Sequence, residues 1–328
     1  MTLPLSVLDL SPVGVGVAPS QAIRDSIALA KVADALGYTR YWFAEHHNMA
    51  SIATSAPEVL IAHASAVTSR IRLGAGGMMI PNHAPLHVIE VFRTLEALAP
   101  GRIDLGLGRA PGTDPVASAA LRRTDTEVNS QLAELLAFER GGFPASHPFA
   151  KIAPMPSDSP AGGLWMLGST LAGASIAAQL GIPYAFAGHF AMRHAVEAIA
   201  HYKAAYEPSK EHPTPYAVLA VTAVCAETAA EAERRAAPIR VAIVKNRTGK
   251  RGPIVSIDEA LAYQMTPEER AIADEFFTGA VIGAPADLAA RLPALARETQ
   301  ADEIMVSTLV PDLASRTQSL ELIARACF

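Results

Sequence analysis

Several histidines follow directly after apolar runs of the chain, next to other polar side chains. These segments are Glu45-His46-His47, Asn82-His83 and Gly188-His189. Because imidazole titrates near neutral pH, histidines that converge on one pocket can hold or move a proton during catalysis. Any one of them alone could instead do no more than close a loop. As a set, they indicate a pocket suited to proton chemistry.

Two glycine-bearing segments have the composition of anion-binding loops. One is Gly108-Arg109-Ala110-Pro111-Gly112 and the other is Gly168-Ser169-Thr170. Glycine lets backbone N–H groups approach a phosphate, hydroxyls at the start of a helix add donors, and arginine adds a charged fork. An ordinary turn followed by a helix N-cap has the same composition. The spacing therefore leaves both interpretations open.

The motifs of competing enzyme classes are incomplete in this chain. Gly14-Val15-Gly16 and Gly106-Leu107-Gly108 both lack a third glycine at the spacing of a dinucleotide-binding loop. No G-x-S-x-G segment is present, and Cys225 lies within an apolar run. Neither a nicotinamide site of this type nor a serine or cysteine nucleophile is expected.

The histidines do not have the spacing of a metal site. Neighbouring side chains on a strand point to opposite faces, so His46 and His47 cannot easily share one ion. His83 and His87 are four residues apart, but Pro85 lies between them and no third ligand is evident. We expect no metal.

Composition limits the partners of the chain. Its 328 residues carry 27 basic and 32 acidic side chains, a net charge of −5, which argues against nucleic-acid and anionic-membrane binding. Half of the residues are hydrophobic, so disorder is excluded, and two cysteines cannot form a disulfide framework. Glycines divide the uncharged run 159–192 into pieces too short to span a membrane. The expected location is the cytoplasm.

The polar segments follow short apolar runs that alternate with amphipathic ones. The runs expected to be strands are 38–44, 71–80, 102–107, 164–167, 182–187, 216–225 and 303–308. With about eight strand candidates in all, the α/β pattern predicts a closed TIM (β/α)8 barrel with insertions rather than an open sheet. No break in composition divides the chain, so we expect one domain over 1–328. Residues 246–279 do not fit the alternation and are expected to form a lid insertion.

Taken together, the motifs resemble those of the bacterial-luciferase-like flavin monooxygenases over essentially the whole chain. The segments that carry the resemblance are Leu5-Ser6-Val7-Leu8-Asp9, Tyr41 to His47, Gly101 to Gly112, Leu164 to Thr170, Val281 to Pro285 and Ala301 to Val306. This resemblance is specific for the family and not for one substrate within it.

The resemblance implies that FMN binds at the carboxyl-terminal rim of the barrel. Arg109, Gly168, Ser169 and Thr170 would then hold its phosphate. Gly76 would run beneath the flavin ring, and Met78 would flank the same surface. His46 matches the reactive histidine of the family, with Glu45 as its neighbouring support.

The resemblance also implies an activity. Such enzymes take reduced FMN from a separate flavin reductase, react it with O2 to a flavin 4a-peroxide, and oxygenate a small organic substrate, here an aldehyde or another carbonyl compound. The luciferases carry a cysteine where this chain has Gly108, so no thiol chemistry is expected, and luminescence is not predicted.

Three alternatives stay open. One is an oxidoreductase that transfers hydride from a reduced deazaflavin without oxygen, and another is a flavin-binding protein without turnover. The third is a barrel lyase or isomerase that uses only a phosphate site. Family resemblance also suggests a homodimer, with the apolar segments Val59-Leu60-Ile61 and Val88-Ile89 as its candidate interface. Those segments could equally pack against the barrel.

Overall fold

The computed structural model describes residues 3–121 and 127–328 of the chain. All strand pairings are parallel, and the order β6-β5-β4-β3-β2-β1-β9-β7, closed by pairing of β7 with β6, makes an eight-stranded barrel. The predicted TIM barrel is therefore confirmed. The strands are β1 (Leu5–Asp9), β2 (Arg40–Phe43), β3 (Arg72–Met79), β4 (Ile103–Gly108), β5 (Gly163–Gly168), β6 (Tyr184–Phe186), β7 (Ala217–Cys225), β8 (Val281–Gly283) and β9 (Glu303–Ser307).

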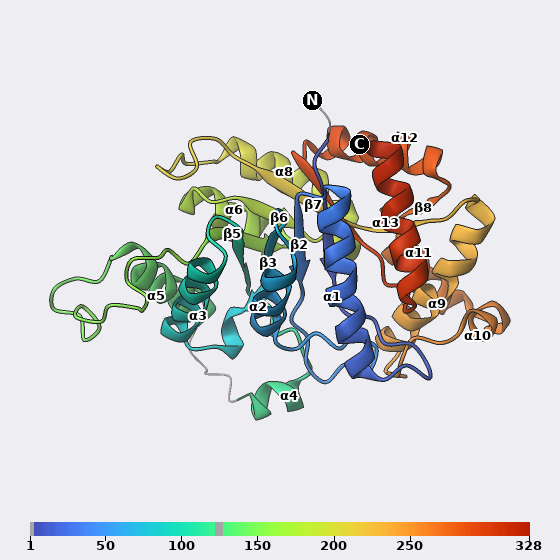
Figure 1. The fold of residues 1–328 in the computed structure, drawn as a ribbon, viewed down its shortest axis with the longest axis horizontal. Helices are drawn as coiled ribbons and strands as arrows, with labels where there is room; N and C mark the ends of the chain where they lie inside the picture. The colour runs from blue at the N-terminus through green and yellow to red at the C-terminus, as the bar shows by residue number, and fades with distance from the viewer. Residues whose placement is uncertain (1–2, 122–126) are drawn as a thin grey trace.

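Helices surround the barrel (Figure 1). Figure 1 shows α3 and α5 on one flank of the molecule and α9, α10 and α11 on the other. None of the helices among the described residues is both long and apolar enough to cross a membrane. The helices are α1 (Pro19–Leu36), α2 (Pro57–Val67), α3 (Pro85–Leu98), α4 (Pro115–Ala120), α5 (Val128–Arg140), α6 (Leu171–Leu180), α7 (Gly188–Ala191), α8 (Ala195–Ala204), α9 (Ala229–Arg247), α10 (Ile257–Ala262), α11 (Pro267–Phe277), α12 (Pro285–Thr299) and α13 (Leu313–Cys327), with short 3-10 turns η1 (Ile80–Asn82) and η2 (Met192–His194).

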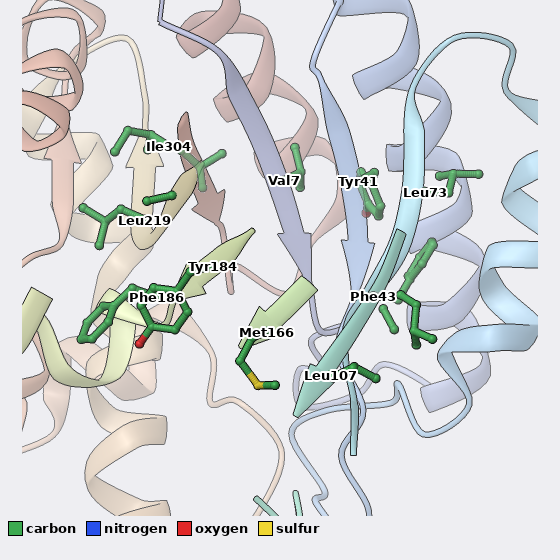
Figure 2. Close-up of a cluster of buried hydrophobic side chains, with 14 of the residues drawn as sticks. Val7, Tyr41, Phe43, Leu73, Leu107, Met166, Tyr184, Phe186, Leu219 and Ile304 are labelled. Carbon is green, nitrogen blue, oxygen red and sulfur yellow. The ribbon is translucent and has the colours of Figure 1, made fainter. Parts of the chain in front are cut away.

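Alternate side chains of each strand enter two different cores. One set, which includes Val7, Tyr41 and Leu73 on adjacent strands, packs in the core shared with the helices (Figure 2). The other set, which includes Leu8 and Trp42, fills the barrel interior. This alternation explains why the strands read as continuous apolar runs, since both of their faces are buried.

A buried ion-pair network occupies the amino-terminal part of the barrel interior. The guanidinium of Arg40 lies 2.8 Å from a carboxylate oxygen of Asp104 and 2.8 Å from one of Glu303. Trp42 donates its indole N–H to Asp104, and the Tyr216 hydroxyl donates to Glu303. Each buried charge therefore has partners, as burial in a medium of low dielectric requires. The network fills this part of the barrel interior with paired charges.

Glycines end α1 and α6. Gly37 has φ = 89°, and its N–H donates to the carbonyls of Ala33 and Asp34 at the end of α1. Gly181 ends α6 with φ = 60°. Left-handed backbone of this kind favours glycine, so these two positions fix where the chain turns back toward a strand.

In the region that departs from the alternation, helices follow a polar, glycine-bearing start. The expected lid, residues 246–279, takes in the last two residues of α9 and all of α10 and α11. Arg251 of this region pairs with Asp114 beyond β4 at 3.4 Å. The short strand β8 follows and pairs only with the end of β7, outside the barrel. Its three residues are too few to produce a periodic signal in the sequence.

The expected dimer interface is not available in this fold. Leu60, Ile61, Val88 and Ile89 are buried in the core between the helices and the barrel, and only Val59 is exposed, at 62%. The interpretation of these segments as a free apolar surface was wrong, because α2 and α3 need those side chains to pack on the barrel.

Candidate active site

A cavity of about 420 Å³ opens at the carboxyl-terminal end of the barrel, where the polar segments of the sequence meet. It brings together six of the eight predicted site residues, which are His46, Gly76, Arg109, Gly168, Ser169 and Thr170. They come from the ends of β2, β3, β4 and β5. Active sites of TIM barrels lie at this end, so the placement agrees with the chemistry expected of those residues.

One part of the cavity offers donors for an anion. The Nε of Arg109 is buried and has no hydrogen-bond partner among the described residues. Thr170 is the N-cap of α6, but its hydroxyl does not cap the helix. The first N–H groups of a helix carry partial positive charge and bind phosphate well. The Tyr184 hydroxyl donates to the carbonyl of Thr170, which fixes the start of α6 against β6.

Gly76 and the two methionines that follow it are placed by a break in the β3 register. Gly76 lines the cavity, and a Cβ at this position would lie 2.8 Å from Cδ1 of Leu8 in the barrel interior. The pairing of β3 with β4 shifts between Gly76 and Met78. Met78 therefore faces the helix layer, is 2% exposed, and does not line the cavity, whereas Met79 does. The placement of Met78 beside the flavin surface was wrong for this reason.

His46 lines the cavity, and one of its ring nitrogens is buried without a hydrogen-bond partner among the described residues. Its backbone N–H donates to the carbonyl of Thr54, which fixes the loop after β2, while its Nδ1 is buried without a partner among the described residues. Burial lowers the pKa of His46 below its ordinary value, with Glu45 opposing the shift and His47 adding to it. The imidazole is therefore neutral at neutral pH and can accept a proton or a hydrogen bond.

Glu45 does not touch the side chain of His46. Its fully buried carboxylate accepts hydrogen bonds from the backbone N–H of Met79 at 2.8 Å and from the side chain of Asn82 at 2.9 Å. The Nε2 atoms of His47 and His83 lie 2.9 Å and 3.0 Å from its oxygens. Glu45 thus ties the end of β2 to the end of β3 and the turn that follows.

These contacts set the protonation of the Glu45 cluster. Burial alone raises the pKa of Glu45, but hydrogen bonds from His83, Asn82 and the Met79 backbone bring it below its ordinary value. Burial likewise lowers the pKa of His83, and the hydrogen bond to Glu45 and its charge raise it above the ordinary value. The pair therefore favours a carboxylate and an imidazolium.

His189 is a site residue that the sequence analysis named only as a rim histidine. It lies in α7, directly after β6, lines the cavity, and is 8% exposed. Its Nδ1 is buried with no partner among the described residues. Burial lowers its pKa to about 4, opposed by a backbone hydrogen bond with Ala220 and assisted by the neighbouring His46. His189 is therefore a second neutral imidazole facing the same space.

A second cavity of about 220 Å³ adjoins the first. Leu10, His46 and Phe190 line both. Its outer wall includes Asn246, Arg247 and Phe276, from the region expected to form a lid. None of the described residues that line either cavity is acidic. No group of three or more metal-binding side chains occurs in the described part of the chain.

The sequence pattern of luciferase-like monooxygenases matches residues 3–303. The chain belongs to the luciferase-like monooxygenase family. A luciferase-like monooxygenase of Escherichia coli K12 is 38% identical over 98% of this chain and 96% of its own length. The N-acetyl-S-alkylcysteine monooxygenase of Bacillus subtilis is 33% identical over 98% and 97%. The expectation of an oxidoreductase of the monooxygenase type is thereby confirmed at the level of the family.

Solved structures of luciferase-like proteins share the fold. The crystal structure of apo-MsnO8 superposes with a TM-score of 0.91 at 36% identity, over 99% of this chain and 97% of that one. The oxygenating constituent of 3,6-diketocamphane monooxygenase of Pseudomonas putida, in complex with FMN, has a TM-score of 0.73 at 20% identity, over 100% and 98%. At that identity the second structure is evidence for the fold alone.

Proposed function

We propose that the chain is a monooxygenase that takes reduced FMN and O2 and oxygenates a small organic substrate, an aldehyde or another carbonyl compound. The observation that carries the proposal is that Arg109, Thr170 and His46 line one cavity. Arg109 Nε and His46 Nδ1 are buried there without a hydrogen-bond partner among the described residues, and the Thr170 hydroxyl does not cap α6. Two electrons of reduced FMN convert O2 and the substrate to the oxygenated product, water and oxidised FMN.

The residues of the chain would bind, orient and shield the cofactor. Arg109, Ser169, Thr170 and the start of α6 would hold the phosphate, and Gly76 leaves room at the end of β3. His46, neutral at neutral pH, would hold or move a proton in the cavity that it lines. Residues 246–279 would act as the lid that excludes water.

Glu45 is assigned a positioning role in this scheme. It fixes the backbone at the ends of β2 and β3 and does not contact the cavity itself. The relative named for N-acetyl-S-alkylcysteine supports a small organic substrate. A separate flavin reductase, a homodimer through another surface and a cytoplasmic location stay predictions.

Anaerobic titration of the protein tests the cofactor. Reduced FMN is expected to bind at least tenfold more tightly than reduced riboflavin, which lacks the phosphate, and more tightly than a reduced deazaflavin. Equal affinities for FMN and riboflavin would contradict the phosphate site. Preference for the deazaflavin would favour hydride transfer instead.

A further inference from the structure

The second cavity has the position of a substrate pocket, if the first holds the flavin as proposed. It touches the first through Leu10, His46 and Phe190. Phe190 packs against Phe276 of α11 with ring centroids 5.7 Å apart, so the boundary between the two cavities is also in contact with the expected lid. A molecule in the second cavity would therefore meet the same histidine that faces the first.

One face of α9 lines the second cavity and changes from apolar to polar along the helix. Ile239, Ala242, Ile243, Asn246 and Arg247 follow each other at helical spacing and all line the second cavity. At a rise of ~1.5 Å per residue, this wall extends over about 12 Å. Its first three residues are apolar, and its last two are polar or charged. Met49, Ile52 and Leu309 add apolar surface on the other sides.

Arg247 differs from the other arginines of α9. Arg234, Arg235 and Arg240 each pair with a glutamate at 2.8–2.9 Å. Arg247 forms no ion pair or hydrogen bond of its guanidinium in the described part of the chain, and it is the one that reaches the cavity. Since no acidic residue lines this cavity, the charge of Arg247 is balanced by no neighbour there.

We infer that the second cavity binds a small amphipathic substrate with an apolar body and one carboxylate, held by Arg247 and Asn246. The apolar body lies along Ile239, Ile243 and Phe276, and the end opposite the carboxylate is the part presented to the first cavity. Guanidinium and amide groups are common partners of a carboxylate, and a charged hydrogen bond of this kind contributes substantially to affinity. This inference rests on the proposed function in one respect, which is that the first cavity binds FMN.

Calorimetric titration with octanoate tests the inference without turnover. Octanoate, its methyl ester and octylamine are titrated into the full-length protein and into Arg247→Met, with and without saturating oxidised FMN. We expect octanoate to bind the unchanged protein at least tenfold more tightly than the ester or the amine. Arg247→Met should weaken octanoate at least tenfold and leave the ester within a factor of two. Arg247→Lys should restore part of the loss.

Arg234→Met is the matched control, because it removes an arginine of the same helix that pairs with Glu231 and does not line the cavity. It should leave octanoate binding unchanged. Equal binding of octanoate to the unchanged protein and Arg247→Met, or its complete displacement by FMN, would overturn the inference. Failure of FMN to bind would overturn the proposed function instead. The comparison of octanoate binding between the unchanged protein and Arg247→Met would still test the inference.

Discussion

His46 and His189 enter the same cavity from strands on opposite sides of the barrel. His46 follows β2 and His189 follows β6, which are four strands apart in the closed order. Both have a buried Nδ1 without a partner among the described residues, and the charge of His46 lowers the pKa of His189. Two neutral imidazoles facing one space can accept hydrogen bonds from a bound ligand but cannot both become charged without a cost.

This arrangement predicts a loss of stability in acid. The pKa of His189 is about 4 in the folded protein against 6.5 in the unfolded chain, so the unfolded chain binds the extra proton between these values. The free energy of unfolding should fall as pH decreases from about 6.5 to about 4, with His189 contributing on the order of 3 kcal/mol. Urea unfolding at pH 7 and pH 4.5 measures this change.

Other groups with shifted pKa values also change the free energy of unfolding in this pH range. The variant His189→Gln separates the contribution of His189 from theirs. The variant should lose distinctly less stability between the two pH values than the unchanged protein. The same dependence in both proteins would show that His189 is not held neutral by burial.

The unpaired Arg109 predicts a large effect on FMN affinity. Arg109→Ala should weaken FMN by ~1.5–3 kcal/mol, or about 10- to 150-fold, the range of a charged hydrogen bond. Fluorescence titration with oxidised FMN measures the dissociation constant. Arg193→Ala is a suitable control, since Arg193 is exposed and pairs with Glu275 at the surface. An unchanged constant for Arg109→Ala would remove this residue from the phosphate site.

Glu45 is predicted to matter for stability and for the titration of His83. Glu45→Gln should lower the free energy of unfolding by about 1–3 kcal/mol, because an NH2 group replaces one of the two acceptor oxygens and the charge is lost. The pKa of His83 should fall, since the Glu45 charge raises it. Thermal unfolding and NMR titration check the two effects. Glu298→Gln, in an exposed pair with Arg291, should change stability by only ~0–1 kcal/mol. A His83 pKa unchanged in Glu45→Gln would contradict the pairing.

The interior network predicts a separate effect on folding. Arg40→Met leaves Glu303 buried without its cation and leaves Asp104 with Arg72 alone, and it should cost ~3–5 kcal/mol of stability. Urea unfolding measures the loss. FMN affinity of the folded variant should not change, because Arg40 does not line the cavity. A loss below about 1 kcal/mol would mean that water or another group replaces the guanidinium.

The sequence predicts the cavity well where its residues stand at strand ends. Arg109 and Gly168 to Thr170 follow apolar runs directly, so barrel geometry alone brings them to one rim. Met78 could not be placed in this way, because the register shift after Gly76 exchanges the faces of the two methionines. A period-two pattern does not reveal such a shift.

The features of the site that the sequence did not predict depend on contacts between segments far apart in the chain. The carboxylate of Glu45 meets His83, which is 38 residues further along the chain, and nothing in the spacing indicates that pairing. The loop after β1 pairs with both Ile52 and Ile254, and these two residues line the second cavity together with residues of α9. Local sequence patterns do not encode such long-range contacts.

The central claim is that this cavity binds reduced FMN and directs its reaction with O2. Stopped-flow mixing of the anaerobic protein–FMN complex with oxygenated buffer tests it most directly. We predict that the absorbance of oxidised flavin returns in two separated phases, and that His46→Ala retains FMN binding within a factor of a few while merging the phases into one. Return in a single phase for the unchanged protein, at the rate of free reduced FMN, would contradict the claim.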